Sequence, residues 1–467
     1  MARFTDLPNE LLLDILDYVQ ATVSAQRTIS SLCLVSRHFV AVAQTYLYRA
    51  PKAFWLTHDD IWKFTILLVR SLLYNPDLRL KVLCLDLHFI DHTGEDFIPV
   101  NGDEFLPMEM MGDMYIELRN QLVETKHWER SLRNRHLNAW IALLLLLTSE
   151  LESLELSTGA SARHDYGYGH HDLERGLFRS FENAHDFTLS DAEMLQSLKT
   201  LRLYEVQPHM MWCSLPALHT LELDAKLNLP EMRDSGVTLN MTCLILHHHA
   251  ALFYDWPANT YHGIYAERIE HFLEACERLK DLRLYFMDSG SSSSYLEEVE
   301  EGSYQSLIQR LIPVSSTLQH LDLTSPVRYI PLTRTWLKDA APIDSLRHFT
   351  SLESLFAFQE TLDLHTGIAI PTSLEHLRIQ RPTLDWVASL YVSLQNHWFD
   401  EVNLHYENDS DLPSPYELYH SSQRADLQRV GIRVPITWSQ IDNDPSWFGV
   451  EDQTRVRRLD HGMMSIN

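Results

Sequence analysis

A six-residue pattern, apolar-x-x-apolar-x-apolar, recurs along the chain after residue 75. Several copies share even their intervening residues, as in Leu-Glu-Ser-Leu and Leu-Lys-Thr-Leu, which argues against chance. The last two apolar positions lie two apart, so they occupy one face of a short strand. The pattern predicts strands in Leu80–Leu85, Leu151–Leu156, Leu198–Leu203, Leu218–Leu223, Met241–Leu246, Leu279–Leu284, Leu318–Leu323 and Leu374–Ile379, with degenerate copies in Leu352–Ala357 and Phe399–Leu404.

Two helical patterns lie between these strands. Ile264–Leu279 places Ile269, Phe272, Leu273 and Cys276 on one face, and Leu137–Leu147 ends in an unbroken apolar run. That run has eight residues, whereas a membrane span needs about twenty, so it predicts a buried helix. Strands joined by such crossovers predict an α/β fold. Its parallel strands stack their leucines into one core, with helices on the outer side.

The residues that alternate with the strand leucines point away from this core. In a parallel ladder they come side by side as a ribbon of charged and aromatic groups. Tyrosine and arginine in such a ribbon suit a protein interface, although a merely solvated face is an equal alternative. The candidate target-binding residues are Arg202, Tyr204, Glu222, Asp224, Asp281, Arg283, Tyr285, His320, Asp322 and Arg378.

The first fifty residues have a different pattern. Leu11, Ile15 and Val19 recur every four residues after Pro8, which suits the first turn of a helix. A second helical stripe follows, made of Leu32, Val35, Phe39, Val42 and Tyr46. A piece this small cannot bury a large core alone, so it is expected to pack against a partner or the rest of the chain.

Three blocks of this segment resemble an F-box: Leu7–Leu16, Leu32–Phe39 and Tyr46–Arg49, in the family's order. The resemblance implies an all-α module that docks on the adaptor Skp1 and, through it, on a cullin. The stretch Gln20–Ser31, where the family has a third short helix, is polar and somewhat long. An amphipathic hairpin capping the next domain is the alternative. Carried over by position, the Skp1-binding residues would be Leu7, Pro8, Leu11, Ile15, Leu16, Leu34, Val35 and Phe39.

The repeated strands resemble leucine-rich repeats, in the irregular form that follows F-boxes in many fungal proteins. The regular family places Asn or Cys three residues after the last leucine, where this chain has Gly159, Val206 or Lys226, so irregular curvature is expected. The resemblance implies a solenoid with parallel strands on its concave face. The expected domains are an F-box at 1–50, a linker helix region at 51–77, the solenoid at 78–440 and a tail at 441–467.

The composition limits the classes of partner and the cellular compartment that we expect for this chain. The chain has 467 residues and a formal net charge of −26, which disfavours nucleic acid and anionic membranes. Acidic residues in the first twenty positions argue against a secretory signal. The five cysteines are scattered, so no disulfide framework is expected and the cytoplasm or nucleus is predicted.

No motif for chemistry stands out. The chain lacks a phosphate loop, a zinc-protease motif and a nucleophile elbow. His247–His249 is the most conspicuous cluster, but neighbouring residues on a strand point to opposite sides, so polar loop contacts are favoured over a metal. We therefore expect no catalytic residue, cofactor or metal.

Together these features predict a non-catalytic substrate-recognition subunit of a Skp1–cullin–F-box ubiquitin ligase. The F-box would dock on Skp1 and the solenoid would bind an unidentified protein substrate. One alternative is a repeat scaffold that binds Skp1 or another protein outside a ligase. A second alternative is an enzyme with its site in the insertions between repeats.

Overall fold

The structure, a computed structural model, describes residues 8–20, 25–35, 37–56, 58–91, 112, 132, 137–160, 195–204, 210–224, 229, 232, 236–247, 261–285, 303–324, 341–362, 369–380, 401–407 and 436–439. Within them the fold is α/β, as predicted, and its centre is an all-parallel sheet in which each strand pairs with the next one in sequence. The strands are β1 (Lys52–Leu56), β2 (Cys84–Asp91), β3 (Ser153–Ala160), β4 (Thr200–Tyr204), β5 (Thr220–Asp224), β6 (Cys243–His247), β7 (Asp281–Tyr285), β8 (His320–Leu323), β9 (Ser354–Phe358), β10 (His376–Gln380), β11 (Glu401–Glu407) and β12 (Ile436–Ser439).

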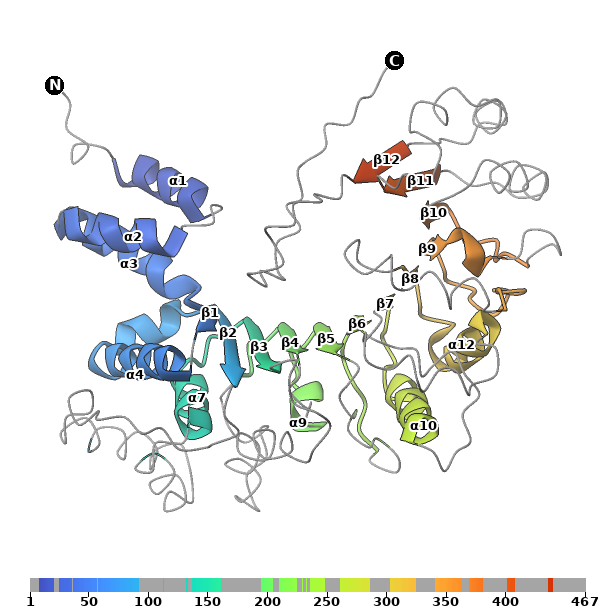
Figure 1. The fold of residues 1–467 in the computed structure, drawn as a ribbon, viewed down its shortest axis with the longest axis horizontal. Helices are drawn as coiled ribbons and strands as arrows, with labels where there is room; N and C mark the ends of the chain where they lie inside the picture. Colours follow the sequence, from blue (N-terminus) through green and yellow to red (C-terminus); the bar gives the residue numbers. More distant parts are fainter. Residues whose placement is uncertain are drawn as a thin grey trace.

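The strands follow one another along an arc, and the helices between them lie on its outer side (Figure 1). We call the opposite sheet face the inner face. The outer helices are α4 (His58–Tyr74), α7 (Leu137–Leu147), α9 (Met210–Cys213), α10 (Tyr261–Glu274) and α12 (Tyr304–Arg310). The 3₁₀ helices are η2 (Pro76–Lys81), η4 (Ile312–Val314) and η6 (Gln359–Thr361).

The core is built from the predicted apolar positions. The two leucines of each strand pair in register with those of the next, as Leu154 does with Leu201 and Leu156 with Leu203. From β2 to β10 these side chains are at most 1% exposed, and the apolar residue that precedes each strand is at most 3% exposed. The run Trp140–Leu147 in α7 is equally buried, which confirms the predicted buried helix. The repeated pattern thus forms one continuous core.

The first copy of the pattern lies two residues later than predicted. Leu85 pairs with Leu154 and Leu87 with Leu156, so this copy is Val82, Leu85 and Leu87. Leu80, the first residue of the expected frame, lies in η2 and is 61% exposed. Both frames satisfy the pattern, and only the pairing with β3 decides between them.

A second regularity joins the strands at their amino ends. From β2 to β9, the carbonyl of the residue just before each strand accepts hydrogen bonds from two consecutive N–H groups of the next copy, at 2.7–3.0 Å. We call this series the carbonyl ladder. It involves the carbonyls of Leu83, Glu152, Lys199, His219, Thr242, Lys280, Gln319 and Glu353. The ladder fixes the register of each copy against the previous one through the backbone alone.

Two expectations about the first eighty residues need revision. The sheet begins at β1, inside the region expected to hold only a linker helix, although α4 supplies that helix. The helical stripe expected to run from Leu32 to Tyr46 is divided between two helices, α2 (Ala25–Val35) and α3 (Arg37–Arg49). With α1 (Asn9–Gln20), the N-terminal segment therefore has three helices, and α2 occupies much of the polar stretch.

Candidate interaction surfaces

The N-terminal helices enclose a small core of their own. Leu16, Ile29, Ala43 and Tyr46 come from all three helices and are 8% exposed or less. The Tyr46 hydroxyl also donates a hydrogen bond of 3.3 Å to the Leu13 carbonyl, tying α3 to α1. These contacts hold three short helices, each too short to be stable alone, as one unit.

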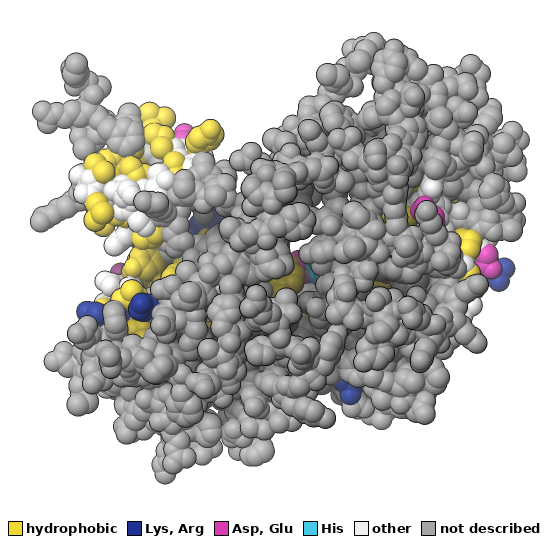
Figure 2. All heavy atoms as spheres, in the orientation of Figure 1, with side chains coloured by type: hydrophobic (Ala, Val, Ile, Leu, Met, Phe, Trp, Pro, Cys, Tyr) yellow, Lys and Arg dark blue, Asp and Glu magenta, His cyan; other side chains and the backbone are white. Residues whose placement is uncertain are grey.

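The outer surface of the same helices is unusually apolar. Of nine large apolar side chains that are well exposed in the described part of the chain, five lie on α1 and α2. Figure 2 shows apolar side chains gathered there. We call this set the helical patch: Leu11 (48% exposed), Leu13 (39%), Tyr18 (78%), Leu34 (89%) and Val35 (66%). Apolar groups concentrated on a surface in this way mark a site that another molecule covers.

The eight residues carried over as Skp1 contacts fall into three groups. Pro8, Leu11, Leu34 and Val35 are exposed, and Ile15 is half-buried. Leu16 and Phe39 are 2% exposed, so in this structure they support the module from within and are out of reach of a partner. Leu7 lies outside the described residues. Leu13 and Tyr18 are two further exposed apolar residues, outside the eight that the resemblance implies.

The inner face of the sheet carries the predicted ribbon. Residues that alternate with the core leucines point away from them, as the burial of β4 and β7 shows. Pairing aligns a central row of these residues across nine strands: Asp86, Glu155, Arg202, Glu222, Ile245, Arg283, Asp322, Phe356 and Arg378. We call these residues and their inner-face neighbours on each strand the polar ribbon.

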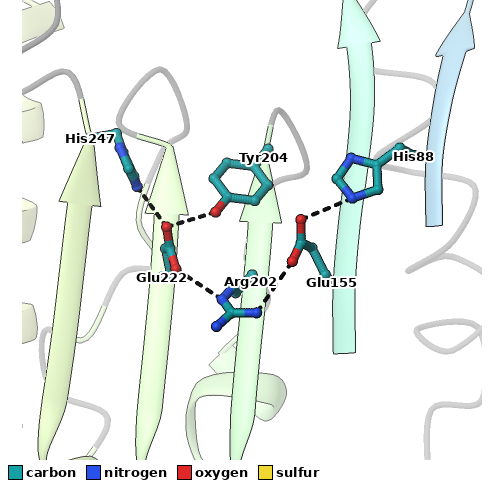
Figure 3. A network of polar contacts seen from close by, with 6 residues as sticks. All are labelled: His88, Glu155, Arg202, Tyr204, Glu222 and His247. Carbon is teal, nitrogen blue, oxygen red and sulfur yellow. Dashed lines mark hydrogen bonds and ion pairs between the residues drawn. The ribbon is translucent and has the colours of Figure 1, made fainter. Parts of the chain in front are cut away.

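Glu222 on β5 is the centre of a hydrogen-bonded network in the polar ribbon (Figure 3). Its Oε1 accepts a hydrogen bond of 2.6 Å from the Tyr204 hydroxyl and lies 2.8 Å from His247 Nε2. Its Oε2 accepts a hydrogen bond of 3.0 Å from Arg202 Nε. Three neighbouring side chains therefore fix one carboxylate, whose side chain is 13% exposed.

The network continues through Arg202 to a second carboxylate (Figure 3). Arg202 Nη1 donates to Glu155 Oε2 at 3.3 Å, and the other oxygen of Glu155 lies 2.9 Å from His88 Nε2. His88 is 2% exposed. The chain of contacts thus crosses five strands, from β2 to β6.

The pKa shifts follow from this geometry. Burial alone would raise the pKa of the Glu222 carboxyl, but the hydrogen bonds from His247 and Tyr204 and the charge of Arg202 hold it below its usual value. Burial and the two carboxylates raise the pKa of Tyr204. Burial opposes the charge of Arg202, yet Glu222 and Glu155 keep its pKa raised. Both oxygens of each carboxylate are engaged, which suits a rigid surface better than a catalytic base.

A second polar group lies on β7, β8 and β10. Arg283 donates to both oxygens of Asp281, at 3.1 and 2.7 Å. Asp322 accepts from the N–H and hydroxyl of Thr324, and burial raises the pKa of its carboxyl. Arg378 stacks over the Phe356 ring at 5.5 Å, and burial lowers its pKa.

Aromatic groups border the network. Tyr204 and His247 contact edge to face at 5.8 Å between ring centres, and His247 lies 5.2 Å from Tyr285. Burial raises the pKa of Tyr285 to about 12. His247 was expected in a loop, but it belongs to β6, where its ring fills the space between the two tyrosines.

The structure brings most of the predicted ribbon residues onto one surface. His320 is exposed beside Asp281, and the side chain of Asp224 lies outside the described residues. Glu155 and His88 also belong to this surface, although the predicted ribbon residues all came from the strands after Leu198. The same alternation in Leu151–Leu156 identifies Glu155. His88 is identified only when the first copy is placed two residues later, because it then follows the last leucine of that copy, Leu87.

No described group of His, Cys, Asp and Glu residues is arranged to hold a metal ion. His248, His249 and the histidines near residue 170 lie outside the described residues. Among the described helices, none has the length and hydropathy that a membrane crossing requires. A scan of protein-family models finds none that matches the chain, and a search of curated proteins finds none with significant similarity.

Proposed function

We propose that this chain is a substrate-recognition subunit of a Skp1–cullin–F-box ubiquitin ligase. In this proposal α1–α3 form the F-box, and the strands and outer helices form an irregular leucine-rich-repeat solenoid. The observation that carries it is the helical patch. Leu34 and Val35 are 89% and 66% exposed on a module that resembles an F-box in the order of its sequence blocks.

The energetics favour a covered patch. Burying a leucine or valine side chain contributes about 1.5–3 kcal/mol, so a partner that covers Leu34 and Val35 gains several kcal/mol. Without a partner these side chains would add nothing to folding and would promote aggregation. An all-α unit that closes its own small core and leaves apolar side chains outside is suited to an adaptor.

The inner face supports the other half of the proposal. It is a broad surface of tyrosine, arginine and carboxylate side chains, which suits contact with a protein. The subunit itself would form no covalent bond. It would act by holding the target near a ubiquitin-charged enzyme, which raises the effective concentration of the target's lysines.

The test is co-purification of the full chain with Skp1 and a cullin. We expect Leu34→Gln combined with Val35→Gln to weaken Skp1 binding at least tenfold, because two apolar contacts are lost. Gln adds no charge at the end of α2, so the helix itself is preserved. Leu80→Gln is the matched control, since Leu80 is a 61% exposed leucine outside the module.

Three outcomes decide between the alternatives. Loss of Skp1 and cullin in the double variant, but not in Leu80→Gln, supports the ligase subunit. Retention of Skp1 without a cullin favours the scaffold. Failure of the unaltered chain to bind Skp1 overturns both the F-box assignment and the proposal.

A further inference from the structure

The polar ribbon presents different charges to solvent than the composition suggests. The side chains of Glu155 and Glu222 are 12% and 13% exposed, and that of Asp281 is 22% exposed. The side chains of Arg202 and Arg283 are 38% and 39% exposed. On this face the acids are therefore largely covered, and the guanidinium groups are what a partner meets first.

The hydrogen-bonding capacity is divided in the same way. Glu155, Glu222 and Asp281 each have both oxygens engaged by neighbours. A guanidinium has five N–H donors. Among the described residues, Arg202 directs Nε and Nη1 at carboxylates, and Arg283 directs Nε and Nη2. Within the described residues, N–H groups of both guanidiniums therefore remain unused by these carboxylates.

Arg378 is the least compensated cation of the polar ribbon. It is half-buried and stacks on Phe356, and within the described residues no carboxylate lies at ion-pair distance from it. The charge of Asp322 favours the charged form of Arg378, but the Asp322 carboxylate accepts its hydrogen bonds from Thr324. A partly desolvated cation without a paired anion is costly, and an incoming anion would relieve that cost.

The three arginines are evenly spaced. All belong to the central row, on β4, β7 and β10, so three strand intervals separate each from the next. Strands lie about 4.8 Å apart, which gives about 14 Å between neighbouring arginines along the sheet. An extended peptide rises about 3.3 Å per residue, so about four residues span one interval.

We infer that the polar ribbon binds an extended acidic segment of a partner protein, which crosses the strands and places carboxylates on Arg202, Arg283 and Arg378. Bidentate arginine–carboxylate pairs would supply both attraction and register. This inference rests on the proposed function, because it identifies the class of target that the inner face would select. It also runs against the net charge of −26, from which a basic target would be expected.

The test is fluorescence anisotropy with the purified full chain and a labelled synthetic peptide. The probe is a Ser/Thr-rich peptide of about thirteen residues with glutamates at positions i, i+4 and i+8, the spacing set by the strand interval. One control peptide has the three glutamates replaced by glutamine. A second has the same composition with the glutamates adjacent. We expect the spaced peptide to bind at least tenfold more tightly than either control.

Arg378→Gln is the decisive variant, because Arg378 makes no ion pair within the part of the chain that the structure describes, so the variant should keep the fold. We expect it to weaken binding of the spaced peptide about tenfold. Arg278→Gln, at an exposed turn before β7, removes the same charge and should change nothing. Arg378→Glu with a peptide carrying lysine at one terminal acidic position should restore binding, which excludes a general loss of structure.

Two results would overturn the inference. One is equal binding of the spaced and the adjacent-glutamate peptides. The other is equally tight binding of a single-stranded oligonucleotide of matching charge, since the face would then be a general anion surface. The assay needs neither Skp1 nor a cullin, so its failure is distinguishable from failure of the ligase proposal.

Discussion

At the scale of single residues, two carboxylates of the polar ribbon show opposite effects of burial. Glu222 accepts three hydrogen bonds from charged or polar neighbours, and these lower its pKa despite burial. Among the described residues, Thr324 is the hydrogen-bonding partner of Asp322, and burial dominates, so its pKa is raised. The ionised form is therefore stabilised at Glu222 and destabilised at Asp322.

The first carboxylate should stabilise the fold. Because the pKa of Glu222 is lower in the folded than in the unfolded chain, its contribution is fully present above about pH 4.3 and is lost as the pH falls through the folded value. We expect Glu222→Gln to reduce the free energy of unfolding at pH 7 by about 1–3 kcal/mol, since Arg202 loses a partner. Urea denaturation of both proteins at pH 7 and at about pH 4 measures this, and the difference should shrink at the lower pH.

The carboxylate of Asp322 should have the opposite effect on stability, because its pKa is shifted in the opposite direction. The raised pKa of Asp322 means that its favourable contribution is complete only below about pH 3.9 and is lost as the pH rises through the folded value. Asp322→Asn keeps an acceptor for Thr324 and removes the buried charge. We expect this variant to be at least as stable as the unaltered chain at pH 7. A loss comparable to that of Glu222→Gln would show that Arg283 and Arg378 outweigh the burial of Asp322.

At the scale of elements, the frame of β2 is the sharpest consequence of pairing. Leu85 and Leu80 both occupy apolar positions of the repeated pattern, but they are 0% and 61% exposed. We expect Leu85→Gln to cost about 2–5 kcal/mol, through a lost core side chain and a buried amide, and Leu80→Gln less than about 0.5 kcal/mol. The midpoint of urea denaturation, followed by circular dichroism, compares the two. Equal effects would favour the frame first expected from the sequence.

The sequence predicted the strands well because each copy carries its own local signal. Leu201 and Leu203 needed no knowledge of their neighbours to be assigned to one buried face. The frame of β2 and the presence of β1 could not be obtained this way, because both are decided by pairing with a neighbouring strand. The break between α2 and α3 was missed because an apolar stripe with helical spacing continues across Ser36.

For the candidate surfaces, the sequence predicted which residues lie side by side but not how their side chains are hydrogen-bonded or buried. Alternation alone placed Arg202 and Glu222 side by side, as they are in the structure. It could not show that both oxygens of Glu222 are engaged, since Oε1 is held by Tyr204 and His247 from two other strands. In the N-terminal helices, a periodic stripe could not separate the buried Leu16 from the exposed Leu34, because three helices share the burial.

At the scale of the whole molecule, the net charge of −26 acts mainly outside the polar ribbon, whose acids are paired or covered. Unpaired surface acids repel one another, and this repulsion falls as salt shortens the Debye length to about 10 Å at 0.1 M. We expect the thermal unfolding midpoint to rise as NaCl is increased from about 0.02 to 0.3 M. KCl at equal ionic strength should act alike. A falling midpoint would show that attractive surface pairs dominate.

The carbonyl ladder has a mechanical consequence. Each strand of the sheet pairs with the strands before and after it, and from β2 to β10 the ladder repeats the same pair of backbone hydrogen bonds at every step. A force that pulls the two ends of the arc apart would therefore load these joints in series, and the weakest joint would open first. In an optical trap, the length of the chain should increase in successive small steps, each from the opening of one joint. A single large rupture is not expected.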